Sequence, residues 1–168
     1  MSDIKKIGFM ADSHDNLPAI RAAVERFNEE KVDLVIHAGD LVAPFTFKEM
    51  NKLNCPFEIV LGNNDGEVLG LFKVFKGKVH QPPFHLKIKN KSILVLHDPG
   101  ILPEVLDKSS YDLIIYGHDH IASYKILADG TKILNPGECG GWLYGKRTIA
   151  IYNLENEKIG IIELPLNA

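Results

Sequence analysis

Short apolar runs alternate with a helical pattern along the first third of the chain. Three of these runs are typical of buried strands: Ile4–Met10, Leu34–His37 and Phe57–Leu61. From about Leu17, with Pro18 in the first turn, apolar residues recur at the i, i+3, i+4 and i+7 spacing of an amphipathic helix. A shorter helix is predicted over Pro44–Asn51. The first third therefore has the order β-α-β-α-β.

The remainder of the chain is richer in strand signals. Phe84–Ile88 and Ser92–Leu96 flank a polar turn and predict a hairpin, and a short helix is predicted over Pro103–Lys108. Further strands are predicted over Leu113–Tyr116, Tyr124–Leu127, Lys132–Leu134, Thr148–Tyr152 and Ile159–Leu164. This order of elements indicates a layered α/β protein with more than one sheet.

Polar residues that can bind metals follow directly after five of the predicted strands. The segments are Asp12-Ser13-His14, Gly39-Asp40, Gly62-Asn63-Asn64-Asp65, His97-Asp98 and Gly117-His118-Asp119-His120. In open α/β sheets the loops after the carboxyl ends of strands form the ligand crevice. We therefore expect these five loops to converge on one site.

The residue types in these loops favour a divalent metal. Imidazole together with carboxylate suits zinc, manganese, iron, cobalt or nickel, and no thiolate is present in the loops. Asp12 and His14 are two residues apart, as are His118 and His120, so each pair points to one side of an extended segment. Either pair can chelate one ion or straddle two. Taken singly, each motif is more typical of a buried structural histidine or a turn, but chance does not explain all five in this order, each after a strand.

The five motifs in this order resemble those of the calcineurin-like metallophosphoesterases. The segment 135–141, Asn-Pro-Gly-Glu-Cys-Gly-Gly, resembles the small bacterial and archaeal phosphodiesterase subgroup. The resemblance implies a four-layer α-β-β-α sandwich of two mixed β-sheets flanked by helices, in a single domain over residues 1–168. It also implies a metal-dependent phosphoesterase, above all a phosphodiesterase, in which a metal-bridging hydroxide attacks phosphorus in line.

The resemblance also implies a role for each residue. Asp12, His14 and His120 would bind a first divalent metal. Asn63, His97 and His118 would bind a second, and Asp40 would bridge both. Manganese is the expected ion, with nickel, zinc, iron or cobalt as alternatives. The residues expected to act in catalysis are Asp40, Asn63, Asn64 and His97.

The sequence departs from the family's commonest pattern at two positions. Many members have histidine where this chain has Asn64, and that histidine is thought to protonate the leaving group. An amide cannot act as an acid, so protonation requires another group or a good leaving group. The second departure is Asp98-Pro99, where Gly-His often follows the ligand histidine, and the missing second histidine removes a possible contact to substrate or metal. Asp98 either orients a metal ligand from behind or belongs to a turn before Pro99.

Composition narrows the classes of function. The chain has 168 residues, 45% of them hydrophobic and 24% charged, with a formal net charge of −3. This balance argues against disorder and makes a nucleic-acid partner or a nuclease a poor fit. A small phosphate ester is the expected substrate. The main alternative is a protein-interaction scaffold on the same fold, since the superfamily contains one with an eroded metal site.

Several other residues are better explained by a structural role than by a functional one. His37, inside a strand, is expected to lie in the core, and His80 and His85 on the surface. Cys139 lacks an adjacent base and is a poor nucleophile candidate. One group of apolar residues can line a substrate mouth, form a dimer face or belong to the core: Leu69, Leu71, Phe72 and Phe75. No signal-peptide or membrane-spanning pattern is present, so we expect a cytoplasmic protein without membrane association.

Overall fold

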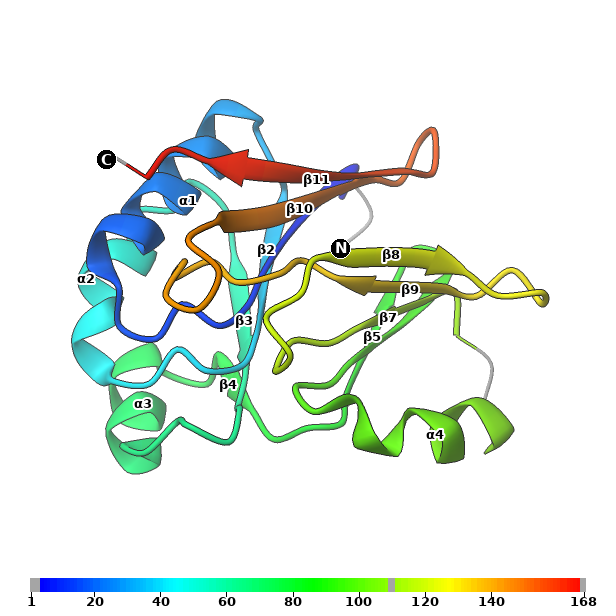
Figure 1. The fold of residues 1–168 in the computed structure, drawn as a ribbon, viewed down its shortest axis with the longest axis horizontal. Coiled ribbons are helices and arrows are strands. Elements are labelled where there is room, and N and C mark those ends of the chain that lie inside the picture. The colour runs from blue at the N-terminus through cyan, green and yellow to red at the C-terminus, as the bar shows by residue number, and fades with distance from the viewer. Residues whose placement is uncertain (1–3, 109–110, 167–168) are drawn as a thin grey trace.

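In the computed structural model, which describes residues 4–108 and 111–166, the strands form two sheets that pack face to face (Figure 1). The first sheet has the order β11 (Lys158–Leu164), β10 (Arg147–Asn153), β1 (Lys6–Met10), β2 (Leu34–Ala38), β3 (Phe57–Val60) and β4 (Val79–His80). The second has the order β5 (Phe84–Ile88), β6 (Lys91–Val95), β7 (Leu113–Ile115), β9 (Lys132–Asn135) and β8 (Ser123–Ile126). Both sheets are mixed, because each combines parallel and antiparallel pairs.

Helices cover the outer faces of both sheets. The helices α1 (Leu17–Glu29), α2 (Phe47–Met50) and α3 (Val68–Phe75) lie beside the first sheet, and α4 (Leu102–Lys108) lies beside the second (Figure 1). Two 3₁₀ turns, Pro44–Thr46 and Pro99–Ile101, precede α2 and α4. The arrangement confirms the predicted α/β fold of two mixed sheets with helices on the outside.

Side chains that alternate along each strand build the layers. Along β1, Ile7 and Phe9 enter the cluster between the sheets, whereas Met10 packs toward the helices. Along β6, Ile93 faces the other sheet and Leu94 faces outward. Because successive strand residues point to opposite faces, two-sided burial requires the continuous apolar runs seen in the sequence.

Helix α1 is fixed at its start by Asn16, two residues after the segment Asp12-Ser13-His14. The Asn16 side chain accepts a hydrogen bond from the backbone N–H of Ala19 at 3.3 Å, which caps the helix. Its amide group also donates to the Gly140 carbonyl at 2.7 Å. One buried asparagine thus ties the loop after β1 to the loop before β10.

The structure differs from the sequence prediction in the segment after β3. Helix α3 and strand β4 were not predicted, and the helix predicted over Pro44–Asn51 is a 3₁₀ turn followed by the four-residue α2. Leu71 and Phe75 are core residues, whereas Leu69 and Phe72 are exposed on the opposite face of α3. The amphipathic helix explains this division. Within the described ranges, no helix is long and apolar enough to span a membrane.

Three further expectations have an outcome in the fold. His37 is fully buried, with Nε2 2.9 Å from Ser13 Oγ, and burial lowers its pKa to about 3, so it is a neutral core residue as predicted. His85 is exposed as predicted. The surface assignment of His80 was wrong, because its ring is half-buried, stacks on Phe84 at 3.7 Å between centroids and contacts Glu58.

Candidate metal centre

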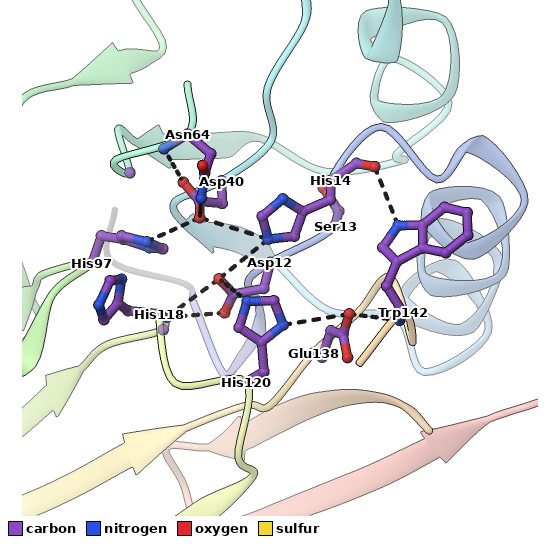
Figure 2. Close-up of polar contacts among 12 residues, drawn as sticks. Asp12, Ser13, His14, Asp40, Asn64, His97, His118, His120, Glu138 and Trp142 are labelled. Carbon is purple, nitrogen blue, oxygen red and sulfur yellow. Dashed lines mark hydrogen bonds and ion pairs between the residues drawn. The ribbon is translucent and has the colours of Figure 1, made fainter. Parts of the chain in front are cut away.

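The five polar loops identified in the sequence meet at one edge of the two sheets. They follow β1, β2 and β3, which are parallel in the first sheet, and β6 and β7, which are parallel in the second. Backbone hydrogen bonds link the loops, including one from His14 N to Asp40 O at 3.0 Å and one from Gly117 N to His97 O at 3.0 Å. Figure 2 shows their side chains pointing toward one another.

Asp12, His14 and His120 form one side of the cluster. Asp12 Oδ1 lies 3.9 Å from His14 Nε2 and 3.7 Å from His120 Nε2. The two imidazole rings stack with their centroids 5.1 Å apart. One donor atom from each of the three residues falls within 4.8 Å of the others, a spacing that can hold a metal ion.

Asp40 lies between this group and a second one. Its Oδ2 atom is 3.2 Å from His97 Nε2 and 3.6 Å from His14 Nε2. Asn63 Oδ1 lies 2.9 Å from both His97 Nε2 and His118 Nδ1. All seven residues expected to bind metal therefore belong to one continuous set of contacts, with Asp40 at its middle.

The backbone at the site is held in an uncommon conformation. Five of the clustered residues have positive φ: Asp12 (51°), His14 (41°), Asp40 (60°), His118 (76°) and His120 (62°). Non-glycine residues adopt this region only where the surrounding structure imposes it, and such positions gather at functional sites. The sharp local turns bring two donors from one loop onto the same centre.

Glycines before the candidate ligands allow the loops to approach closely. Gly39, which has a φ of 98°, lies against the His97 ring, and an added Cβ would overlap it. A Cβ at Gly117 would lie 2.8 Å from Asp12 Oδ2. The Gly-Asp and Gly-His pairs are therefore explained by contact between the backbone of one loop and the ligand of another.

Burial and hydrogen bonding shift the pKa values of the two carboxylates, Asp12 and Asp40, in opposite directions. Burial raises the pKa of Asp12 to about 6, although the nearby His97 and His120 oppose the shift. Burial acts in the same direction on Asp40, but hydrogen bonds from His97 and Asn64 outweigh it and hold the pKa of Asp40 below its usual range. The same bond to Asp40 raises the pKa of His97 despite the burial of its ring.

These shifts predict that metal binding to this site depends on pH. Without metal, Asp12 keeps its proton below about pH 6, and His97 keeps its proton to a higher pH than an ordinary histidine. Both must lose a proton to bind a cation, so metal affinity should rise with pH through this range and then level off. Calorimetric titration with Mn²⁺ in buffers of different ionisation enthalpy will measure the protons released. Equal affinity at pH 5 and pH 7.5, with no proton release, would contradict this expectation.

Glu138 was not singled out as a functional residue from the sequence, yet it stands directly behind His120. Its Oε1 atom lies 3.3 Å from His120 Nδ1, and the side chain is almost fully buried. The same carboxylate accepts hydrogen bonds from the backbone N–H groups of Trp142, at 2.6 Å, and Leu143. It therefore orients His120 so that the opposite ring nitrogen, Nε2, faces Asp12.

Glu138→Gln is expected to weaken metal binding about 10–100-fold, the usual effect of losing a partner behind a histidine ligand. The glutamine oxygen can still accept the Trp142 N–H bond, so the fold should persist. Metal affinity is measured by calorimetry, and Glu163→Gln, an exposed position on β11, is the matched control. Unchanged affinity in Glu138→Gln would show that the carboxylate does not support His120.

Asp65 and Asp98 support the loops and do not face the cluster as donors. Asp65 is buried and accepts backbone N–H bonds from Asp40 at 3.2 Å, Val42 at 2.6 Å and Gly62 at 2.7 Å. The Asp98 side chain accepts from Gly100 N at 2.8 Å and caps the 3₁₀ turn. The turn interpretation of Asp98 is therefore correct.

Two further groups near the site are the Ala38 carbonyl and the Cys139 thiol. The group that orients His97 is the Ala38 carbonyl, 2.9 Å from Nδ1. Cys139 is fully buried, and burial raises the pKa of its thiol to about 12, which agrees with its poor standing as a nucleophile.

The donor atoms fit a divalent metal. Two carboxylates, four imidazoles and one amide oxygen supply oxygen and nitrogen ligands without sulfur. His14 Nε2 is buried and has no hydrogen-bond partner among the described residues, although it points between Asp12 and Asp40. A buried nitrogen without a partner is costly in an empty cluster and is satisfied when a cation binds there.

Known proteins share both the sequence and the fold of this chain. The family model "Calcineurin-like phosphoesterase superfamily domain" matches residues 6–157. Phosphodiesterase MJ0936 from Methanocaldococcus jannaschii is 37% identical over 159 residues, which cover 91% of this chain and 95% of the relative. A solved archaeal phosphodiesterase is 36% identical with a TM-score of 0.87, covering 95% of this chain and 99% of that one. Yfce, a phosphoesterase from E. coli, shares the fold at 19% identity and a TM-score of 0.71, covering 95% and 100%.

Proposed function

Because the chain belongs to the calcineurin-like phosphoesterase superfamily, we propose that it is a phosphodiesterase dependent on two divalent metal ions. The observation that carries the proposal is the convergence of seven oxygen and nitrogen donors on one centre. The similarity to a phosphodiesterase along nearly the whole chain supports the choice of a diester. A cluster of histidines without the central carboxylate of Asp40 would not support a site for two metal ions.

Each proposed ligand has a position that suits its role. Asp12, His14 and His120 would hold the first ion, and Asn63, His97 and His118 would hold the second. Asp40 contacts both groups, because its Oδ2 atom approaches a histidine of each. We propose manganese as the working ion, with nickel, zinc, iron or cobalt as alternatives, since all five accept imidazole and carboxylate.

When bound, two such ions would stabilise the negative oxygens of the phosphate group and lower the pKa of water. The protein's own residues prepare the site for an anionic ester. Asp12 and Asp40 carry two negative charges against the four positive charges of the ions, so the loaded site keeps a positive surplus. The Ala38 carbonyl accepts a hydrogen bond from the Nδ1–H group of His97, so that Nε2, once it has lost its proton, presents its lone pair to the centre.

The proposal is tested by a screen of phosphate diesters and monoesters with each of the five metals. We expect hydrolysis of bis(p-nitrophenyl) phosphate that depends on added metal and exceeds that of p-nitrophenyl phosphate. A protein-interaction scaffold would show no turnover with any metal. Faster hydrolysis of the monoester would show that the protein is a phosphomonoesterase and not a phosphodiesterase.

A further inference from the structure

A pocket opens directly beside the candidate metal centre and shares one residue with it. The pocket has a volume of about 350 Å³ and is lined by His120, Ile121, Ala122, Tyr144, Lys146 and Thr148. His120 is the shared residue, so a molecule held at the centre by its phosphate group can extend into the pocket without leaving it. The volume lies in the range of small-molecule sites.

Large apolar side chains line this pocket or lie on the same loop, and they are open to solvent. Ile121 is 55% exposed and Tyr144 is 59% exposed, and Trp142, on the same loop as Tyr144, is 63% exposed. Clustered exposed apolar side chains next to a concave polar site are typical of ligand-binding surfaces. An isolated exposed residue would need no explanation, but these residues gather from two separate loops.

The loop that carries the aromatic side chains is held in place by the metal centre itself. The Trp142 indole N–H donates to the His14 carbonyl at 3.3 Å, and its backbone N–H donates to Glu138 Oε1 at 2.6 Å. A Cβ at Gly140 would lie 2.9 Å from Trp142 Cδ1, so the ring packs closely on the backbone of that loop. Trp142 is therefore already in place before a ligand binds, and it fixes the start of the loop that leads to Tyr144, which reduces the entropy cost of recognition.

We propose that this pocket binds the ester group that remains on phosphorus, and that it selects an alcohol with a planar aromatic ring. The inference rests on the proposed phosphodiesterase function. Asn64 and Trp142 lie on opposite sides of Asp12 and Asp40 in Figure 2. If the leaving alcohol departs on the Asn64 side, the second alcohol is one of the three remaining substituents on phosphorus, and the pocket beside His120 is where we place it.

The contacts available in the pocket suit an aromatic ring better than a short alkyl chain. Tyr144 and Ile121 offer an aromatic face and an aliphatic surface, and rings stack on such side chains with a defined geometry. Lys146 brings a positive charge to the wall, which disfavours a cationic ring. A methyl ester would leave most of the pocket unfilled.

The kinetic test compares two diesters with the same leaving group, phenyl p-nitrophenyl phosphate and methyl p-nitrophenyl phosphate. After correction for their rates in alkaline solution, kcat/KM should favour the phenyl ester at least about tenfold, or about 1.4 kcal/mol. Tyr144→Ala should bring the ratio close to one, whereas Tyr144→Phe should keep it. Phe72→Ala, which removes an exposed ring from α3, is the control. A ratio near one in the unchanged protein, or one that Tyr144→Ala leaves intact, overturns the proposal.

A binding test separates failure of the pocket from failure of the proposed function. Trp142 is the only tryptophan in the chain, so its fluorescence reports on this loop alone. Phenylphosphonate and methylphosphonate, which cannot be hydrolysed as esters, are titrated into the zinc-loaded protein. Tighter binding of phenylphosphonate supports the pocket even if no ester is hydrolysed. The absence of hydrolysis would then refute only the proposed function. Equal binding of the two phosphonates refutes the pocket even if diesters are hydrolysed.

Discussion

Replacing Asp40 by asparagine is expected to abolish diester hydrolysis and to reduce the amount of bound metal. Asp40 is the carboxylate that approaches a histidine of each proposed metal group, at 3.2 and 3.6 Å. Asparagine has nearly the same shape but no charge, so it cannot neutralise two adjacent cations. Loss of one preorganised electrostatic group costs about 10²–10³-fold in rate, and a missing bridge should cost at least that much.

The fold of Asp40→Asn should survive, because the backbone N–H of Asn64 can still donate to the side-chain oxygen at position 40. Hydrolysis is measured with bis(p-nitrophenyl) phosphate, bound metal by elemental analysis, and folding by circular dichroism. Asp129→Asn, in the turn between β8 and β9, is the matched control. Near-wild-type turnover with two ions bound would show that Asp40 is not the bridging ligand.

The second large effect is expected from Asn64→His, and it should appear only with poor leaving groups. In the unchanged protein the Asn64 amide donates to Asp40 Oδ2 at 2.7 Å and has no acidic proton for a departing alcohol. The rate should therefore depend steeply on the pKa of the leaving group. A histidine within reach of the leaving oxygen supplies an acid worth about 10²–10⁴-fold, which should flatten that dependence.

The surrounding carboxylates strengthen this expectation. Asp65 is engaged by three backbone N–H groups, which hold it away from the role of the acid, and Oδ1 of Asp98 caps a turn. The measurement is a series of aryl and alkyl diesters with the same second ester group, and Asn90→His, in the exposed turn of the β5–β6 hairpin, is the control. A shallow dependence in the unchanged protein would mean that another group already protonates the leaving oxygen.

Most of the strands, β4 excepted, could be predicted from the sequence because two-sided burial leaves a clear signature. Strands such as β2 and β7 lie between two layers, so nearly every residue in them is apolar. Such a run can be identified as a strand without knowing which strands lie beside it. Polar residues at the ends of these runs then stand out, and parallel strands bring their ends to one edge. The grouping of His14, Asp40 and His97 follows from that topology.

The features that were missed depend on contacts that no local pattern records. Helix α3 was not predicted because it is short and contains Gly70, which lies against Pro44. Glu138 supports His120 from 18 positions along the chain, in a glycine-rich loop that resembles an ordinary turn. The positive φ angles at Asp12 and His120 are imposed by packing between loops, which spacing along the sequence does not reveal.

The central claim, that two metal ions at this cluster carry out the hydrolysis, is tested most directly by removing and restoring them. The protein is chelated until its metal content is close to zero and then titrated with Mn²⁺ while diester hydrolysis is followed. We expect activity to vanish on chelation and to return fully as the second equivalent binds. Full activity in protein verified to be free of metal would contradict the claim.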